Sequence, residues 1–213
     1  MSKLIGRLLV VLAFGWAGTV NATLLLSVDT NFNGIHTCGT WCYDAGLTGG
    51  FAFTVNSTIY VDGLGIWDEG GDGIGRDVSA GLWIDGGALL ATAVISSSSP
   101  LEFSNGDAWR VADIAGVVLE PGSYVVGSTF YSGSPRFYTT PGISTIAEVM
   151  FAGGRIHSLG GNGLERPDQY WDYSIGPNLR VGPIPAPIPA TLPLLGIGLA
   201  ALGYSRRKRN LQS

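Results

Sequence analysis

One stretch of the 213-residue chain predicts its fold most directly: Val78-Ser79-Ala80-Gly81-Leu82-Trp83-Ile84-Asp85-Gly86-Gly87-Ala88-Leu89-Leu90-Ala91-Thr92-Ala93-Val94-Ile95. Two apolar runs of strand length, 78–84 and 88–95, flank an Asp-Gly-Gly sequence whose glycines can adopt the positive φ of a tight hairpin turn. Neither run shows the spacing of an amphipathic helix. The stretch therefore predicts two adjacent antiparallel strands.

Similar runs recur along the chain between clusters of Gly, Asn, Asp and Ser. The expected strands are 50–55, 58–67, 78–84, 88–95, 109–114, 116–119, 123–131, 144–151 and 179–181, with a loop at 96–100 and a turn at 120–122. About nine short strands at this spacing are typical of a sandwich or jelly roll. The sequence thus predicts an all-β fold with a single β-sandwich or jelly-roll-like domain.

The N-terminus has the pattern of a secretory signal peptide, residues 1–22. Lys3 and Arg7 precede an apolar stretch, and Val20-Asn21-Ala22 matches a small-residue cleavage site. A retained N-terminal anchor is the alternative. Cleavage would leave a domain of about 160 residues, 23–182, which is long enough to bury a core.

The C-terminal segment 183–213 has three parts. Prolines alternate along 183–189, an uncharged stretch covers 188–205, and four basic residues follow at 206–209. A helix over the 17 residues 188–204 spans roughly 25 Å, close to the lower limit for crossing a bilayer core of about 30 Å. The basic cluster favours the cytoplasmic side, so the body is expected outside the inner membrane, facing the periplasm. An ordinary single-pass anchor is the alternative.

This tail resembles the PEP-CTERM sorting signal of exported bacterial proteins, in its Pro-x-Pro-Ala variant. The matching residues are Pro187, Pro189, Ala190, the Leu194–Leu199 core with Gly203, and Arg206, Arg207, Lys208 and Arg209. The resemblance implies a Gram-negative source, recognition by an exosortase-type membrane protease, and removal of the tail during sorting to the cell surface or extracellular matrix. No Glu stands between the two prolines, which is where the chain departs from the main form of the signal.

The body resembles an uncharacterised β-sandwich domain that recurs in PEP-CTERM proteins and has some likeness to carbohydrate-binding jelly rolls. The resemblance covers roughly 50–131, through Val61–Asp68, Val78–Trp83, Trp109-Arg110 and Val118–Gly127. It implies a fold and a destination, with no activity attached.

Charge and composition narrow the function classes. Six of the 12 basic residues lie in the two terminal signals, so the body keeps six arginines against 16 acidic residues, a formal net charge of −10. Such a body repels polyanions, which argues against nucleic acid as a partner. His36 and His157 are the only histidines, both are expected in loops, and no Gly-x-Ser-x-Gly elbow occurs. We therefore expect no enzyme, although a glycosidase needs only two carboxylates.

One acidic loop is a candidate metal site. Asp68, Glu69, Asp72 and Asp77 lie on a Gly-rich stretch whose backbone could wrap oxygen ligands around Ca²⁺. The loop does not match an EF-hand, because positions 3 and 12 would be Gly70 and Ser79. The alternative is a solvated hairpin loop without metal, and no other cofactor is expected.

The two cysteines, Cys38 and Cys42, are expected to form a disulfide in an exported protein. A zinc site with His36 is the alternative, although it lacks a fourth ligand. The Cys-x3-Cys spacing also differs from the redox motif.

A cluster of aromatic residues is the candidate glycan contact. Tyr170, Trp171 and Tyr173 lie among polar residues, and exposed aromatic rings can stack on sugars. A segment packed on the sandwich edge is the alternative, and Trp67 and Trp83 are expected to be buried. The function predicted from the sequence is a noncatalytic exported surface or matrix protein; the alternatives are a carbohydrate-binding module, with or without Ca²⁺, and a hydrolase.

Overall fold

A computed structural model describes residues 22–28, 35–36, 47–104, 106–130, 137–138, 143–157, 163–171 and 176–185. The chain divides into two compact units, Met1–Pro183 and Ile184–Ser213. The predicted signal peptide up to residue 21, both cysteines, Tyr173 and the tail from residue 186, which holds the sorting residues, lie outside the described residues. Among the described residues, no helix has the length and apolar character needed to cross a membrane.

The described part of the first unit is built from two main antiparallel sheets. The five-stranded sheet has the order β1 (Thr23–Leu24), β15 (Pro177–Gly182), β5 (Ile59–Trp67), β9 (Asp107–Leu119) and β8 (Leu101–Ser104). The six-stranded sheet has the order β14 (Gln169–Tyr170), β13 (Val149–His157), β4 (Leu47–Val55), β10 (Gly122–Phe130), β6 (Val78–Ile84) and β7 (Leu89–Ile95). Short pairs join β12 (Ile143–Thr145) to β2 (Leu26–Val28) and β11 (Phe137–Tyr138) to β3 (Ile35–His36). The predicted all-β fold is confirmed.

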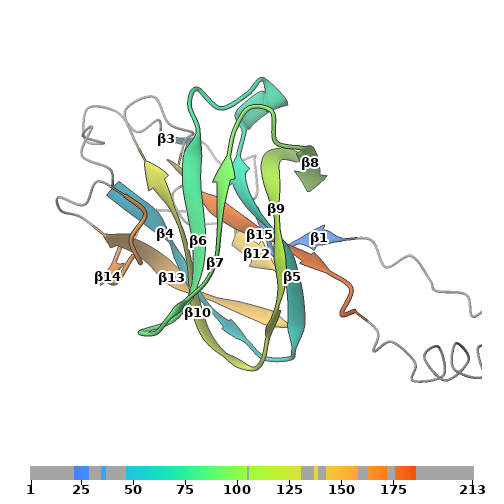
Figure 1. Cartoon of the computed structure of the whole chain (residues 1–213), viewed down its shortest axis with the longest axis vertical. Helices are drawn as coiled ribbons and strands as arrows, with labels where there is room; N and C mark the ends of the chain where they lie inside the picture. The colour runs from blue at the N-terminus through green and yellow to red at the C-terminus, as the bar shows by residue number, and fades with distance from the viewer. Residues whose placement is uncertain are drawn as a thin grey trace, which may run out of the picture. The chain divides into compact units, whose positions relative to one another are not determined.

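One core lies between the two sheets (Figure 1). Phe51, Phe53 and Val55 alternate along β4 with residues that face the other way, and all three are buried, as the two-residue period of a strand requires. Val61, Leu64 and Ile66 of β5 and Trp109 of β9 join the same cluster from the opposite sheet. The sheets therefore pack face to face in a sandwich-like arrangement.

The Asp-Gly-Gly turn correctly predicts the hairpin of β6 and β7. Strands β6 and β7 pair antiparallel from Val78 with Ile95 to Trp83 with Leu89, and Gly86 in the turn has a φ of 71°. The turn predicted at 120–122 does not connect two strands of one sheet. It joins β9 of the five-stranded sheet to β10 of the six-stranded sheet, so the chain crosses from one sheet to the other at this turn.

Other predicted elements differ from the structure. The two strands expected over 109–119 are one strand, β9, which pairs with β5 on both sides of a register shift between Val61 and Gly63. The single strand expected over 144–151 is two, β12 and β13, separated by a turn at 147–148. The expectation that His157 and His36 lie in loops is wrong, since His157 ends β13 and His36 ends β3.

The outer face of the six-stranded sheet carries a second buried apolar patch. Ala52, Trp83 and Val125 lie in register across β4, β10 and β6, and are 2, 5 and 0% exposed, yet none belongs to the core cluster between the sheets. The expected burial of Trp83 is confirmed, but it occurs on the outside of the sandwich.

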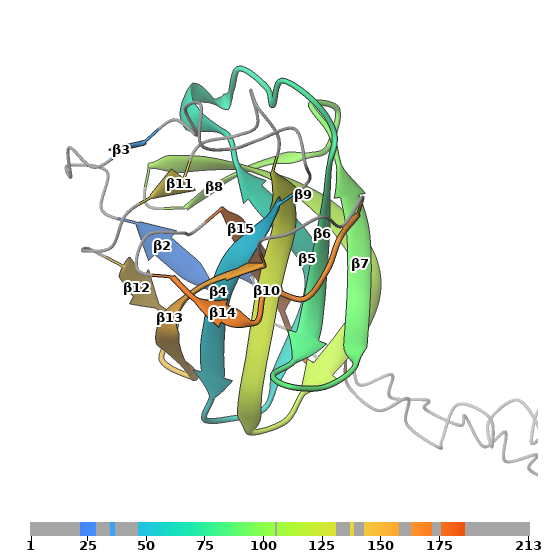
Figure 2. The ribbon, with the colours of Figure 1, turned by 90° about the vertical axis from the view of Figure 1, so that its left-hand side faces the viewer.

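Residues 163–168, which we call the strap, lie on this outer face and lead into β14. Figure 2 shows the strap and β14, in orange, passing across the sheet in front of β4 and β10. Glycines make the close approach possible: a Cβ on Gly127 would lie 2.8 Å from Pro167, and one on Gly81 would lie 3.0 Å from Leu164. The backbone nitrogen of Glu165 donates to the Thr48 hydroxyl of β4 at 3.1 Å.

Candidate functional site

Two aromatic side chains are exposed where the strap ends. Tyr170 is 67% and Trp171 45% exposed, which agrees with the polar sequence around them. Their backbone is fixed, because β14 pairs with β13 through Tyr170 and Arg155, and the Trp171 nitrogen donates to the Gly154 carbonyl at 3.1 Å. The two exposed rings are thus held at the edge of the six-stranded sheet by backbone hydrogen bonds.

Strand β13 supplies the support for the Tyr170 ring. Gly153 has a φ of 107°, and a Cβ there would lie 2.9 Å from Tyr170 Cε2, so the position requires glycine for both conformation and space. The guanidinium carbon of Arg155 lies 5.9 Å from the centre of the Tyr170 ring, within the range of a cation–π contact. One face of Tyr170 is therefore engaged by the protein itself.

His157 lies between two carboxylates of the strap. Its Nε2 is 2.6 Å from Glu165 Oε2 and its Nδ1 is 3.2 Å from Asp168 Oδ1. The His157 side chain is 26% exposed, whereas both carboxylates are about half exposed. The hydrogen bond from His157 lowers the pKa of Asp168 below its usual value, with smaller contributions from the positive charges of His157 and Arg166.

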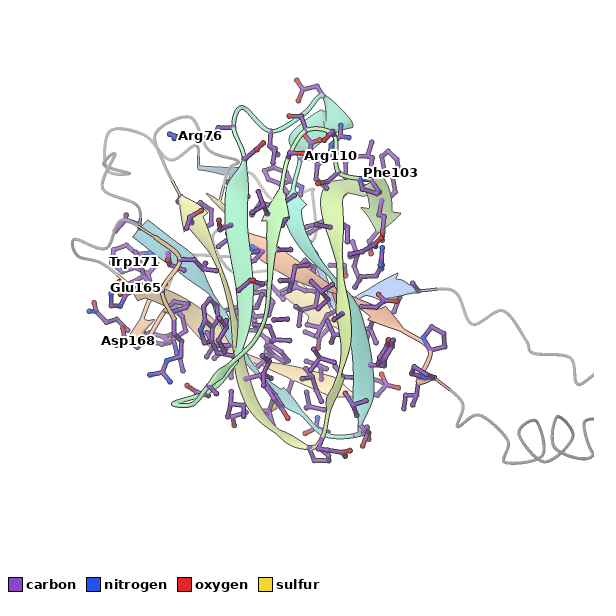
Figure 3. All side chains as sticks on the ribbon, in the orientation of Figure 1. Arg76, Phe103, Arg110, Glu165, Asp168 and Trp171 are labelled. Atoms are coloured by element: carbon purple, nitrogen blue, oxygen red, sulfur yellow. The ribbon has the colours of Figure 1, made fainter. Side chains whose placement is uncertain are left out.

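We call the side chains of Arg155, His157, Glu165, Asp168, Tyr170 and Trp171 the β13–β14 surface. Figure 3 shows Glu165, Asp168 and Trp171 on the same side of the molecule, next to β13 and β14. The surface combines apolar ring faces with hydrogen-bond acceptors and donors within one small area. That combination suits a hydroxyl-rich ligand with flat apolar faces, as a sugar ring has.

The predicted metal residues lie apart from this surface, on the loop after β5, which contains the 3-10 turn η1 (Glu69–Gly71). Asp68 is 2% exposed, and its carboxylate accepts from the Gly73 nitrogen at 3.1 Å and from Arg110 Nε at 2.7 Å. Asp72 and Asp77 are exposed, and the side chain of Glu69 lies outside the described part of the chain. The Asp68 carboxylate is thus already neutralised by an arginine.

Arg110 also closes the loop by donating to the Gly71 and Ser99 carbonyls at 3.0 and 3.2 Å. Within the described residues, no group of three or more His, Cys, Asp or Glu side chains is gathered as metal ligands would be. The calcium site stays a prediction, and binding through Asp68 would have to compete with Arg110.

A second ionic cluster, not predicted from the sequence, lies on the five-stranded sheet. Arg180 of β15 contacts Asp62 at 2.7 Å, Glu102 at 2.8 Å and Asp113 at 2.6 Å. Burial alone would lower the pKa of Arg180, but the hydrogen bonds with these carboxylates outweigh burial and raise it. The four residues come from β15, β5, β8 and β9, so the cluster ties these neighbouring strands together.

Sequence reasoning identified the two described aromatic residues of the β13–β14 surface and missed its charged members. Asp168 and Arg155 have no distinguishing spacing, and His157 was expected in a loop. One signal was present: Glu165, Arg166 and Asp168 concentrate charge in a chain that is only 13% charged.

Comparison with protein-family models, curated proteins and solved structures gives no match for this chain. What the β13–β14 surface binds is therefore inferred from its own side chains.

Proposed function

We propose that the chain is a noncatalytic exported protein of the cell surface or extracellular matrix. In this proposal a signal peptide and a C-terminal sorting helix flank one jelly-roll-like β-sandwich. An exosortase-type protease in the inner membrane would recognise the tail around Pro187, Pro189 and Ala190 and release the domain. The support is the order of an Ala22 cleavage pattern, a β domain, an apolar segment and the basic cluster 206–209.

Intact-mass analysis of the protein from its native host tests this itinerary. The secreted or surface fraction is expected to contain a chain that begins near Thr23 and lacks the apolar segment 188–205. Recovery of a full-tailed species from membranes alone would make the protein an ordinary anchored ectodomain and would contradict sorting through the tail.

We further propose that the domain binds an extracellular polysaccharide through the β13–β14 surface. The observation that supports this function is the exposure of Tyr170 and Trp171 on backbone that β13 holds in place. Tyr170 and Trp171, 67 and 45% exposed, are adjacent aromatic residues beside hydrogen-bonding side chains, whereas Phe103 is exposed singly. A neutral glycan fits best, because the 16 acidic residues of the chain repel polyanions.

Replacing Trp171 by alanine is expected to weaken binding of the full chain to neutral oligosaccharides on an array about tenfold, since a stacked aromatic pair contributes roughly 0.5–1.5 kcal/mol beyond its buried area. Phe103→Ala is the matched control: Phe103 is also exposed, at 71%, but lies on β8 of the other sheet. Equal binding by wild type and the Trp171 variant would refute this site, and equal loss in both variants would indicate nonspecific adhesion.

A further inference from the structure

The strap contacts the sheet through apolar side chains and a few polar groups. Leu164 and Pro167 lie over glycines of β6 and β10, the Glu165 nitrogen donates to Thr48, and the Arg166 side chain reaches the Gly87 carbonyl at 3.4 Å. Single surface contacts of this kind open easily, because each contributes little against the entropy of a free segment. Two of the polar contacts join the strap to one side chain of β13, His157.

His157 holds the strap at two points that are three residues apart. Its two ring nitrogens contact Glu165 and Asp168, at 2.6 and 3.2 Å. A neutral imidazole has one N–H and can donate to only one of these carboxylates, whereas the imidazolium has two and carries the charge that attracts both. Histidine is also the side chain whose ordinary titration falls between pH 5 and 8.

The arginines near His157 are engaged elsewhere and do not pair with both Glu165 and Asp168 as His157 does. Arg155 of the same strand lies over the Tyr170 ring of β14 and donates to the Gly154 carbonyl at 3.2 Å, and Arg166 of the strap points to Gly87. The strand opposite places the neutral Thr48 beside His157. Glu165 and Asp168 thus have His157 as their common cation among these groups.

We propose that His157 is a pH-sensitive latch: as imidazolium it holds the strap on the six-stranded sheet and keeps Tyr170 and Trp171 in place for a ligand. The role of His157 in ligand binding rests on the polysaccharide function proposed above, whereas its hold on the strap does not. Closing and opening of the strap would then regulate the same surface that binds the glycan.

The direction of the pH effect follows from the two partners. The lowered pKa of Asp168 means that its stabilising contribution is present above the ordinary Asp value and is lost only as the pH falls through the lowered pKa. Neutral His157 has one N–H fewer than the imidazolium and no positive charge, so the latch is weaker when the ring is neutral. The strap is therefore expected to be held best in mildly acidic solution and to loosen above neutral pH.

Hydrogen exchange of the full chain at pH 5.5 and pH 8 tests the latch directly. The rates are expressed as protection factors, which correct for the pH dependence of exchange in free amides. The amides of Glu165 and Trp171, which donate to Thr48 and Gly154, are expected to lose about threefold to tenfold protection at the higher pH, the size that loss of one or two exposed ion pairs allows. Strand β4, 47–55, is the internal reference and should not change.

His157→Gln keeps a hydrogen-bonding side chain but cannot titrate, so its strap should show the same reduced protection at both pH values. Glu148→Gln, at an exposed carboxylate in the turn before β13, is the matched control and should behave as wild type. Equal protection at both pH values in wild type would overturn the latch, and so would a pH effect that persists in His157→Gln.

Glycan binding is measured separately on the same samples. Protection that changes with pH in a protein that binds no glycan at either pH would support the latch and refute the polysaccharide function. Glycan binding without any pH effect on the strap would support the polysaccharide function and refute the latch.

Discussion

Replacing Arg110 by methionine is expected to lower the free energy of unfolding by about 3–4 kcal/mol, because it leaves the Asp68 carboxylate charged in a buried position. Asp68 is 2% exposed, and once the 2.7 Å ion pair is gone its carboxylate has lost its arginine and still accepts from the Gly73 nitrogen. Arg110 also holds two loop carbonyls, of Gly71 and Ser99, which lose their donor. Urea unfolding followed by tryptophan fluorescence measures the change.

A double variant separates the charge from the packing. If the uncompensated carboxylate causes the loss, Asp68→Asn combined with Arg110→Met should recover a large part of the stability that Arg110→Met alone removes. A double variant less stable than Arg110→Met would mean that the loop contacts of Arg110, and not the buried charge, carry the effect.

Replacing Asn178 by leucine is expected to lower the free energy of unfolding by about 3 kcal/mol, because three buried backbone groups lose a hydrogen bond to its side chain. The Asn178 side chain accepts from the Leu26 and Leu179 nitrogens at 3.1 and 2.8 Å and donates to the Leu26 carbonyl at 2.7 Å. Leucine has a similar size but no polar atom, so the Leu26 backbone would be buried without these hydrogen bonds. The N-terminal residues 23–28 are expected to detach first.

Urea unfolding gives the overall change, and hydrogen exchange at Leu26 gives its location. Asn56→Ala, at an exposed turn position, is the control and should stay within about 0.5 kcal/mol of wild type. Full protection of Leu26 in the Asn178 variant would show that pairing with β12, whose Thr145 lies opposite Leu26, is sufficient to hold β2.

The strand predictions succeed where neighbouring residues in the sequence determine the strand, and fail where a distant partner strand does. Strand β6 has the predicted bounds, Val78–Ile84, because its apolar run and the following Asp-Gly-Gly turn are adjacent in sequence. Strand β14 was not among the nine expected strands, although a strand or loop packed on the sandwich edge was the alternative for this segment; its two residues form a strand because β13 offers them a partner. Strand β9 was divided at Ala115, and the structure has a register shift there: the pairing with β5 passes from Asp113 to Val117 within one strand.

The candidate surface was predictable only in its aromatic members. Tyr170 and Trp171 stand out because large rings among polar residues are unusual, and both are exposed. His157 and Asp168 are eleven residues apart, and their contact exists because the strap returns the chain to the end of β13. Trp83 is a related case: its burial was expected from an apolar run, but the sequence could not indicate that it lies outside the core.

By itself the sequence determined the all-β fold and the β6–β7 hairpin, because both follow from the period and turn chemistry of neighbouring residues; it marked Tyr170 and Trp171 as candidates but left open whether they are exposed or packed on the sandwich edge. Only the tertiary structure decided that Arg110 neutralises Asp68, that Asn178 carries the backbone of Leu26, and that His157 joins two carboxylates of the strap. The physical reason is that a charge or a hydrogen-bonding group is satisfied by whatever lies within about 3 Å of it, and in a sheet those neighbours are set by strand pairing between distant parts of the chain.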